Sequence, residues 1–363
     1  MPSSRQAGSA GPPRRATLRD VADRAGVSTS TASLVFSGKG PVAVATAERV
    51  RAAAAELGFS GPDPLASSLR QGRVGTVAVV VEGPLRDAFR DPFALGVLDG
   101  LAEELDSAGR SMLLVAQPPD DPGRAVDQLA TQAVDAAVFP LCGIATNPLV
   151  DHLAARGVPL VGSGAPVDRR VAHVLTDEAA AIALTTRLVL GLGHTRVAHV
   201  SMPLTPGAAT GWAEPAEVAA AAYPDAAGRA RGFLTLTGDD APLVQTADLT
   251  VGSGEAAGRL LLDVPVARRP TAVVCQADLL AAGVVRAARA LGLRVPQDVS
   301  VTGFDGVDLP WLDETLTTVL QPGRAKGRAL GRLVRRRLEG EDVADEPFPV
   351  ELRVGETTAP PPA

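Results

Sequence analysis

The side chains best suited to nucleophilic or metal-binding chemistry are few: four histidines and two cysteines, at His152, His173, His194, His199, Cys142 and Cys275. They form no Ser/His/Asp or Cys/His set, and the two cysteines stand far apart in apolar runs without metal-ligand spacing. The glycine-rich stretch 252–258 lacks the lysine of a phosphate-binding loop. The sequence therefore predicts no catalytic residues, no cofactor and no metal site.

Hydroxyl chemistry is concentrated near the N-terminus instead, where five side chains crowd one segment: Ser28, Thr29, Ser30, Thr31 and Ser33. Such hydroxyls bind phosphate oxygens and the edges of bases. The segment follows a short turn that contains Gly26, and Ser28 is a typical N-terminal cap, so we expect a helix from here to about Phe36.

Two further helices flank this segment. Thr17 followed by Asp20 is a helix-start signature, and apolar residues then recur at helical spacing up to Ala25. A third helix, about 44–57, presents Ala47, Val50, Ala54 and Leu57 on one face and ends at Gly58. Two short helices around a tight turn, supported by a third, predict a helix-turn-helix over residues 17–60, the head.

A proline-flanked hinge, residues 61–73, follows the head and carries Leu65, Ala66, Ser68, Leu69 and Arg70. Head and hinge together resemble the LacI/GalR family of bacterial transcriptional regulators. The resemblance rests on these five hinge residues and on the following positions of the head: Thr17, Asp20, Val21, Ala22, Ala25, Gly26, Val27, Ser28, Thr31, Ser33, Val35, Gly38, Thr46, Arg49 and Val50.

The resemblance implies that the second helix enters the major groove of double-stranded operator DNA. Thr29 and Ser30 would read bases, while Ser28, Thr31 and Ser33 would contact phosphates. Leu34 stands where the family usually has an arginine that reads guanine, so it can at most pack on a thymine methyl group. Leu69 would be the wedge that a hinge helix inserts into the minor groove, beside Arg70.

Charge is distributed unevenly along the chain. Residues 1–73 hold ten Lys/Arg and five Asp/Glu, a net charge of +5, and since the whole chain is −6, residues 74–363 sum to −11. A basic end on an acidic body suits attraction to phosphate at that end. Residues 1–16, rich in Ser, Gly, Pro and Arg, indicate a disordered arm, and no signal peptide or membrane span is predicted. We expect a cytoplasmic, nucleoid-associated protein.

From Val74 onward, apolar strand-like runs alternate with amphipathic helices, which predicts parallel sheets with right-handed crossovers. The pattern begins again at Val171–Leu175, so we expect an α/β body, residues 74–356, with two sheets in two lobes. The first lobe would hold about 74–172 and 322–346, and the second about 173–321 and 347–356. A strand is expected at Leu249–Val251, and residues 357–363 should be a flexible tail.

The body also resembles the effector domain of the same family, which is similar to periplasmic sugar-binding proteins. That resemblance implies a homodimer and a cleft that binds a small polar effector, a sugar or related metabolite. Arg229 and Asp305 match its ligand-anchoring positions, Phe93 would stack on an apolar ligand face, and Asp177 would reach in from the other lobe. Ala277 and Ala94 replace an Asn and a Phe of the family, which argues against a typical sugar.

The sequence thus predicts a DNA-binding transcriptional regulator, a repressor, whose operator affinity is controlled by an effector bound between two lobes. The alternative is a solute-binding protein with the same two-lobed body. A head of this kind and the lack of a signal peptide disfavour that alternative.

Overall fold

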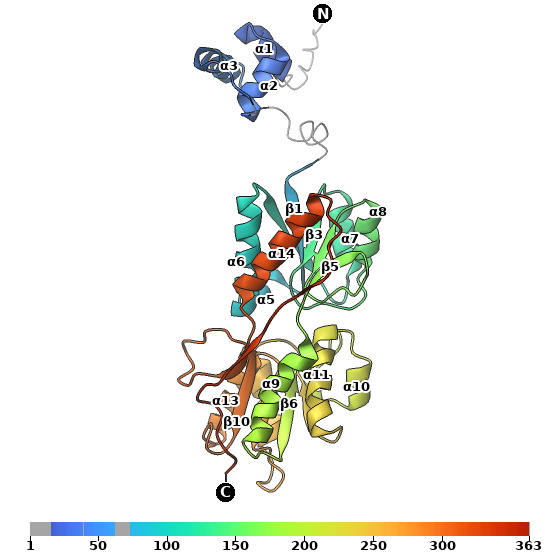
Figure 1. The fold of residues 1–363 in the computed structure, drawn as a ribbon, viewed down its shortest axis with the longest axis vertical. Helices are drawn as coiled ribbons and strands as arrows, with labels where there is room; N and C mark the ends of the chain where they lie inside the picture. The colour runs from blue at the N-terminus through green and yellow to red at the C-terminus, as the bar shows by residue number, and fades with distance from the viewer. Residues whose placement is uncertain (1–15, 39, 62–72, 363) are drawn as a thin grey trace, which may run out of the picture. The chain divides into compact units, whose positions relative to one another are not determined.

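The computed structural model of the chain describes residues 16–38, 40–61 and 73–362, and Figure 1 shows its ribbon. The chain divides into two compact units, Met1–Val74 and Gly75–Ala363. The predicted arm up to residue 15 and residues 62–72 of the predicted hinge lie outside the described residues.

In its described residues, the first unit has three helices, α1 (Leu18–Ala25), α2 (Thr29–Ser37) and α3 (Val44–Glu56). Thr17 and Asp20 close the predicted capping box at the start of α1, and Gly26 ends that helix in the left-handed conformation at φ 66°. Buried alanines and valines hold the helices together, among them Val21, Ala32 and Val50. Phe59 completes this core with its ring against Phe36, whereas the predicted core residue Leu57 is 37% exposed.

The second unit is built on two sheets. The first has six parallel strands in the order β12-β5-β4-β3-β1-β2. Its strands are β1 (Thr76–Glu82), β2 (Ser111–Gln117), β3 (Ala136–Phe139), β4 (Leu160–Gly162), β5 (Val171–Leu175) and β12 (Glu346–Pro347). Val77, Val79 and Val81 of β1 belong to one apolar core and Ala78 and Val80 to another, because successive side chains of a strand point to opposite faces.

Helices therefore cover both faces of this sheet. Helices α6 (Pro92–Ser107) and α14 (Gly323–Leu338) pack together over the face with Val77 and Val79, and the short α5 (Leu85–Ala88) adds to this core. On the opposite face lie α7 (Gly123–Ala130) and α8 (Pro148–Ala155). Sheet and helices together form the first lobe (Figure 1).

The second sheet has seven strands in the order β13-β11-β10-β9-β6-β8-β7, parallel except for its two edge strands. They are β6 (Val197–Ser201), β7 (Gly211–Trp212), β8 (Leu243–Gln245), β9 (Ala272–Cys275), β10 (Ser300–Asp305), β11 (Thr317–Leu320) and β13 (Glu351–Arg353). With them pack α9 (Glu178–Gly191), α10 (Pro215–Ala219), α11 (Pro224–Thr237), α12 (Val251–Leu262) and α13 (Asp278–Ala290), forming the second lobe. Two parallel-rich sheets after a helical head confirm the predicted fold class.

One expected lobe boundary and one expected strand of the body are wrong. Strand β5, assigned from the sequence to the second lobe, pairs with β4 in the first sheet, so the chain first crosses between lobes after Leu175. β12 joins the first sheet beside β5, in agreement with the expected extent of the first lobe to about residue 346. The expected strand at Leu249–Val251 is also wrong, because Thr250 caps the start of α12 and the strand lies earlier, at β8.

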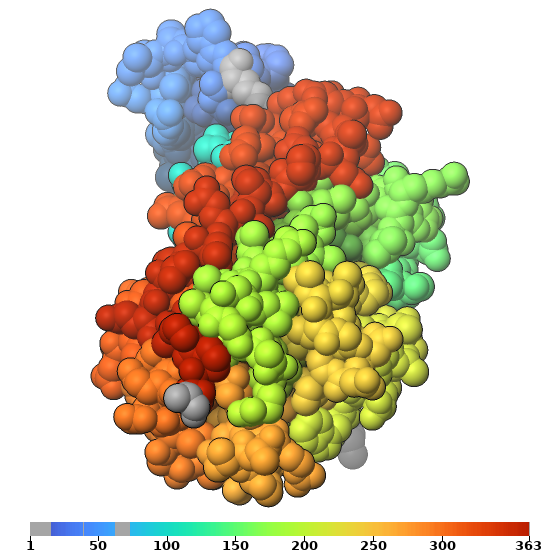
Figure 2. All heavy atoms as spheres, turned by 60° about the horizontal axis from the view of Figure 1, so that its bottom comes forward, coloured from blue at the N-terminus to red at the C-terminus, as the bar shows by residue number. Residues whose placement is uncertain are grey.

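The expected flexible tail is wrong as well. Thr357 is fully buried, and its hydroxyl donates a 2.7 Å hydrogen bond to the carbonyl of Val301. The N–H of Ala359 binds the hydroxyl of Ser300, while its carbonyl oxygen contacts His194 Nε2 at 2.8 Å. Figure 2 shows the C-terminal segment in dark red lying along the second lobe. Polar contacts with residues far away in the sequence hold this segment, and its composition alone does not reveal them.

Within the described part of the chain, none of the helices has the length and apolar character needed to cross a membrane.

Candidate functional site

The hydroxyl groups predicted to contact DNA gather at the start of α2. Ser28 caps this helix by accepting the N–H of Thr31 at 3.1 Å, and its Oγ lies 2.8 Å from the hydroxyls of Ser30 and Thr31. Thr29 and Ser30 are exposed, whereas Thr31 and Ser33 are half-buried. The exposed start of a helix, where free N–H groups and hydroxyls coincide, is suited to bind phosphates and base edges.

The helical head, residues 17–61, is less basic than the N-terminal segment 1–73 as a whole. Residues 17–61 hold five basic and four acidic side chains, and Arg24 forms an ion pair with Glu56 at 2.6 Å. Leu34 is 38% exposed, an apolar group on the helix that carries the hydroxyls. The predicted wedge Leu69 and its neighbour Arg70 lie outside the described residues.

A second candidate site is a cavity of about 890 Å³ in the unit Gly75–Ala363. Its walls include the carboxyl ends of strands from both sheets, or the residues that follow them: Glu82 at the end of β1, Leu141 and Cys142 after β3, Met202 after β6, Asp305 at the end of β10 and Gln321 after β11. Ligands of parallel sheets bind at this end of the strands, and the volume is that of a small-molecule site.

Arg229 of α11 lies in the wall of this cavity and is only 3% exposed. Its Nε donates to Glu178 Oε2 at 2.6 Å, one terminal nitrogen donates to the carbonyl of Gln276 at 2.6 Å, and its guanidinium lies 3.6 Å above the ring of Phe304. Burial alone would lower the pKa of Arg229, but Glu178 and Asp305 raise it above its ordinary value. The side chain is therefore a fixed cation with a defined orientation.

Asp305 also lines the cavity, next to Arg229, and has an unusual backbone for a residue other than glycine, with φ 107°. Burial raises the pKa of its carboxyl well above the ordinary value, and Arg229 opposes this shift. Asp278 supports the loop after Asp305, because its carboxylate accepts the N–H of Val307 at 2.8 Å and the hydroxyl of Thr318 at 2.6 Å. Strained backbone in a cavity wall is typical of functional sites.

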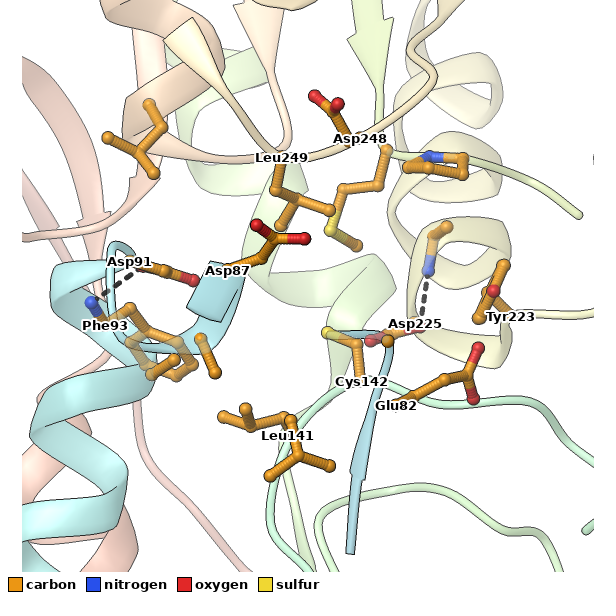
Figure 3. Close-up of a pocket in the computed structure, with 18 of the residues that line it drawn as sticks. Glu82, Asp87, Asp91, Phe93, Leu141, Cys142, Tyr223, Asp225, Asp248 and Leu249 are labelled. Atoms are coloured by element: carbon orange, nitrogen blue, oxygen red, sulfur yellow. Dashed lines mark hydrogen bonds between the residues drawn. The ribbon is translucent and has the colours of Figure 1, made fainter. Parts of the chain in front are cut away.

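Phe93 and Asp91 lie at one side of the cavity, and Glu82, Tyr223 and Asp225 lie at the other (Figure 3). The N–H of Phe93 donates to Asp91 Oδ1 at 2.9 Å, and burial raises the pKa of Asp91 against this bond. Burial also raises the pKa of Glu82, while Tyr223 and the N–H of Ile144 lower it. Oxygen acceptors thus face a cavity whose cations include Arg229, so a ligand with both donors and acceptors would fit it.

Asp177 does not take the predicted place in the cavity. It is exposed and caps α9 by accepting the N–H of Ala180 at 3.0 Å, and it is absent from the cavity lining. Its neighbour Glu178, which sequence reasoning missed, lines the cavity and pairs with Arg229. The carboxylate of Asp177 is bonded to the start of its own helix and does not line the cavity, whereas that of Glu178 does.

Ala94 and Ala277, which stand where the family has a Phe and an Asn, differ in whether they line the cavity. Ala94 is buried and lines the cavity, where its methyl group occupies less space than the ring of a Phe. Ala277 is buried at the start of α13 and does not line the cavity.

His194 binds Thr271 and the C-terminal segment, a structural role at a helix end. Within the described residues, no three His, Cys, Asp or Glu side chains gather in a way that could hold a metal ion.

Both parts of the chain match known protein families. Residues 17–61 match the model for bacterial regulatory proteins of the lacI family, and residues 186–358 match the periplasmic binding protein-like domain. An HTH-type transcriptional regulator of Mycolicibacterium smegmatis is 33% identical over 338 residues, 89% of this chain and 91% of that protein.

Solved structures agree with this placement. A complex of the transcriptional regulator CelR with cellobiose has 30% sequence identity and a TM-score of 0.65, covering 94% of this chain and all of that one. The lac repressor dimer bound to operator and the anti-inducer ONPF has a TM-score of 0.74 over 95% of this chain and all of that one; at 23% identity it supports the fold alone.

The buried carboxyl of Asp278 predicts how the stability of the body depends on pH. Burial raises the pKa of Asp278 from 3.8 to about 7, against the opposing hydrogen bond from Thr318. The folded state therefore holds a proton that the unfolded chain releases, and its contribution to stability is complete below pH 4 and lost as the pH rises through 7. The loss should be roughly 4 kcal/mol.

Urea unfolding at a series of pH values between 4 and 8 tests this pH dependence. The fluorescence of Trp212 and Trp311, the two tryptophans of the chain, reports unfolding, and both lie in the body. Asp278→Asn should show a smaller decline of the unfolding free energy than the wild type. The exposed Asp263, replaced by Asn, is the control and should leave the decline unchanged. Parallel pH profiles for the wild type and Asp278→Asn would show that Asp278 keeps an ordinary pKa.

Proposed function

The chain belongs to the LacI family of DNA-binding transcriptional regulators, and we propose that it is a repressor whose operator affinity is set by a small polar molecule in the cavity. The observation that carries the proposal is the combination, in one chain, of an exposed hydroxyl-rich helix start and a cavity lined by a fixed guanidinium and several carboxylates. The matched family of the head also disfavours the alternative of a solute-binding protein.

At the DNA, α2 would present its first turn to the major groove. Thr29 and Ser30, both exposed, would reach base edges, and Thr31 and Ser33 would contact phosphates. Ser28 would act mainly as the cap that holds this turn, because its hydroxyl is already bonded within the helix start. Leu34 would favour a thymine methyl group, so the operator would differ from one read by an arginine at this position.

In the body, the effector would bind Arg229 and Asp305 and stack on Phe93. Neutral polyols carry both donors and acceptors, as this lining requires, and cellobiose is the ligand named for the related CelR complex. We therefore take a sugar or a related metabolite as the effector class and cellobiose as the first probe.

Coupling between the two sites would follow from the two lobes. A ligand that contacts both lobes favours one lobe arrangement, and in a homodimer this sets the spacing of the two heads. A protein that binds operator DNA would be located in the cytoplasm, associated with the nucleoid.

Removing residues 1–74 should abolish sequence-specific DNA binding while leaving a folded body, because the body has its own cores. Duplexes selected by the full chain from a random library supply the specific site. The affinity of residues 75–363 for that site and for a scrambled duplex should be equal, a loss of specificity of at least about 1,000-fold. Thermal unfolding checks that the shortened chain is folded. Preference for the selected site in the shortened chain would contradict the role of the head.

Replacing Arg229 should weaken the response to the effector without changing ligand-free operator binding. Arg229→Met leaves Glu178 without its cation, so the double variant with Glu178→Gln separates the loss of a ligand contact from the unpaired carboxylate. Both variants should respond to cellobiose at least about tenfold more weakly than the wild type.

The matched control is Arg231→Met, which removes an exposed arginine from the same helix. Operator affinity is measured with and without cellobiose for all four proteins. An unaltered response in the double variant would show that Arg229 does not hold the ligand.

A further inference from the structure

Lys326 is a buried cation with no role so far in the proposed effector site. It lies near the start of α14 and is only 4% exposed, and the following buried positions of the helix are apolar, among them Ala329, Leu330 and Leu333. Burying an ammonium group costs several kcal/mol unless it is paired and fully hydrogen-bonded. Such a residue needs a reason to remain in the core.

The partners of Lys326 come from the segments that cross between the lobes. Its Nζ donates to Gln321 Oε1 at 3.0 Å and to Thr176 Oγ1 at 3.3 Å, and the hydroxyl of Thr176 donates to Gln321 Oε1 at 2.7 Å. The ring of Phe348 lies 5.8 Å from the same nitrogen. Thr176 follows β5, Gln321 follows β11 and Phe348 follows β12, so one ammonium group contacts all three crossing segments.

These partners leave the ammonium group incompletely satisfied. It carries three N–H groups, and in the described part of the chain it donates two hydrogen bonds, both to uncharged oxygens. Among the described residues it forms no ion pair with a carboxylate, in contrast to Arg229, which pairs with Glu178. Burial lowers the pKa of Lys326, and Glu178 opposes this shift through the charge it places nearby.

Lys326 also lines the cavity, together with Arg229 and Gln321. Its third N–H group has no acceptor among the described residues, and a donor of this kind at the border of a cavity is suited to bind an oxygen of a ligand. The same side chain is bonded to two of the crossing segments.

We propose that Lys326 contacts the effector directly, using its remaining N–H to bind a hydroxyl or carboxylate oxygen, and so determines specificity in the cavity. The proposal rests on the proposed function of the cavity as an effector site. A ligand held by Lys326 pulls on Gln321 and Thr176 as well, so the same contact passes ligand binding to the segments between the lobes.

The competing role is purely structural, with Lys326 retained because it ties the crossing segments together. The two roles predict opposite effects of Lys326→Met, which keeps the length of the side chain and removes its charge. A ligand contact is dispensable for folding, and an apolar replacement of a buried charge is often neutral or stabilising. A structural tie is required for folding, so its loss would destabilise the ligand-free protein.

The test compares the full-length wild type, Lys326→Met, and the control Arg328→Met, which removes a more exposed cation from the same helix. Urea unfolding without ligand, followed by tryptophan fluorescence, measures stability. Calorimetry with cellobiose, ribose and gluconate measures binding, and the three probes separate neutral hydroxyl ligands from a carboxylate. Lys326→Gln, which keeps donors without the charge, serves as a second variant.

We expect Lys326→Met to be at least as stable as the wild type and to bind any probe of the wild type at least about tenfold more weakly. Arg328→Met should bind like the wild type, and Lys326→Gln should fall between them. A marked loss of stability in ligand-free Lys326→Met, or unchanged affinity for the bound probe, overturns the proposal. If none of the probes binds the wild type, the sugar class proposed for the cavity fails, and the stability comparison still decides the role of Lys326.

Discussion

The cavity depends on the burial of one guanidinium group. Arg229 is nearly inaccessible to solvent, so its charge is stable there only because Glu178, the carbonyl of Gln276 and the face of Phe304 surround it. Glu178 belongs to α9, Gln276 follows β9 and Phe304 belongs to β10, so the cation fixes neighbouring elements of the second lobe against one another. The remaining polar groups of the cavity are arranged around this fixed charge. Asp305 lies beside it with a strained backbone, and Asp278 supports the loop that follows.

Local rules of the sequence predicted much of the head. Thr17, Gly26 and Ser28 act through hydrogen bonds and backbone angles within a few residues, so their roles as caps and turn could be predicted from neighbours alone. Arg229, Asp305 and Phe93 were placed in the cavity through a family resemblance, and the structure brings all three to its lining. Leu69 and Arg70, outside the described residues, stay predictions.

The errors came from contacts between distant parts of the chain. The apolar run of β5 suits either lobe, and only its pairing with β4 decides between them. Thr357 is buried because its hydroxyl binds Val301, which lies 56 positions earlier. Asp177 and Glu178 are adjacent in the sequence, and the cap geometry of α9 decides which of them reaches Arg229. Lys326 could not be found from its spacing, because lysine near the start of a helix is ordinarily solvated.

The proposed coupling between the cavity and the head is a free energy shared by two binding sites, so it must act equally in both directions. The dissociation constant of cellobiose, or of another probe that the cavity binds, is measured by calorimetry with the free protein and with the protein saturated by its selected operator. The account predicts that operator DNA changes the affinity for the probe by the same factor by which the probe changes the affinity for operator, about 5- to 150-fold for typical coupling. Equal affinity of the probe for the free and the operator-bound protein would contradict it.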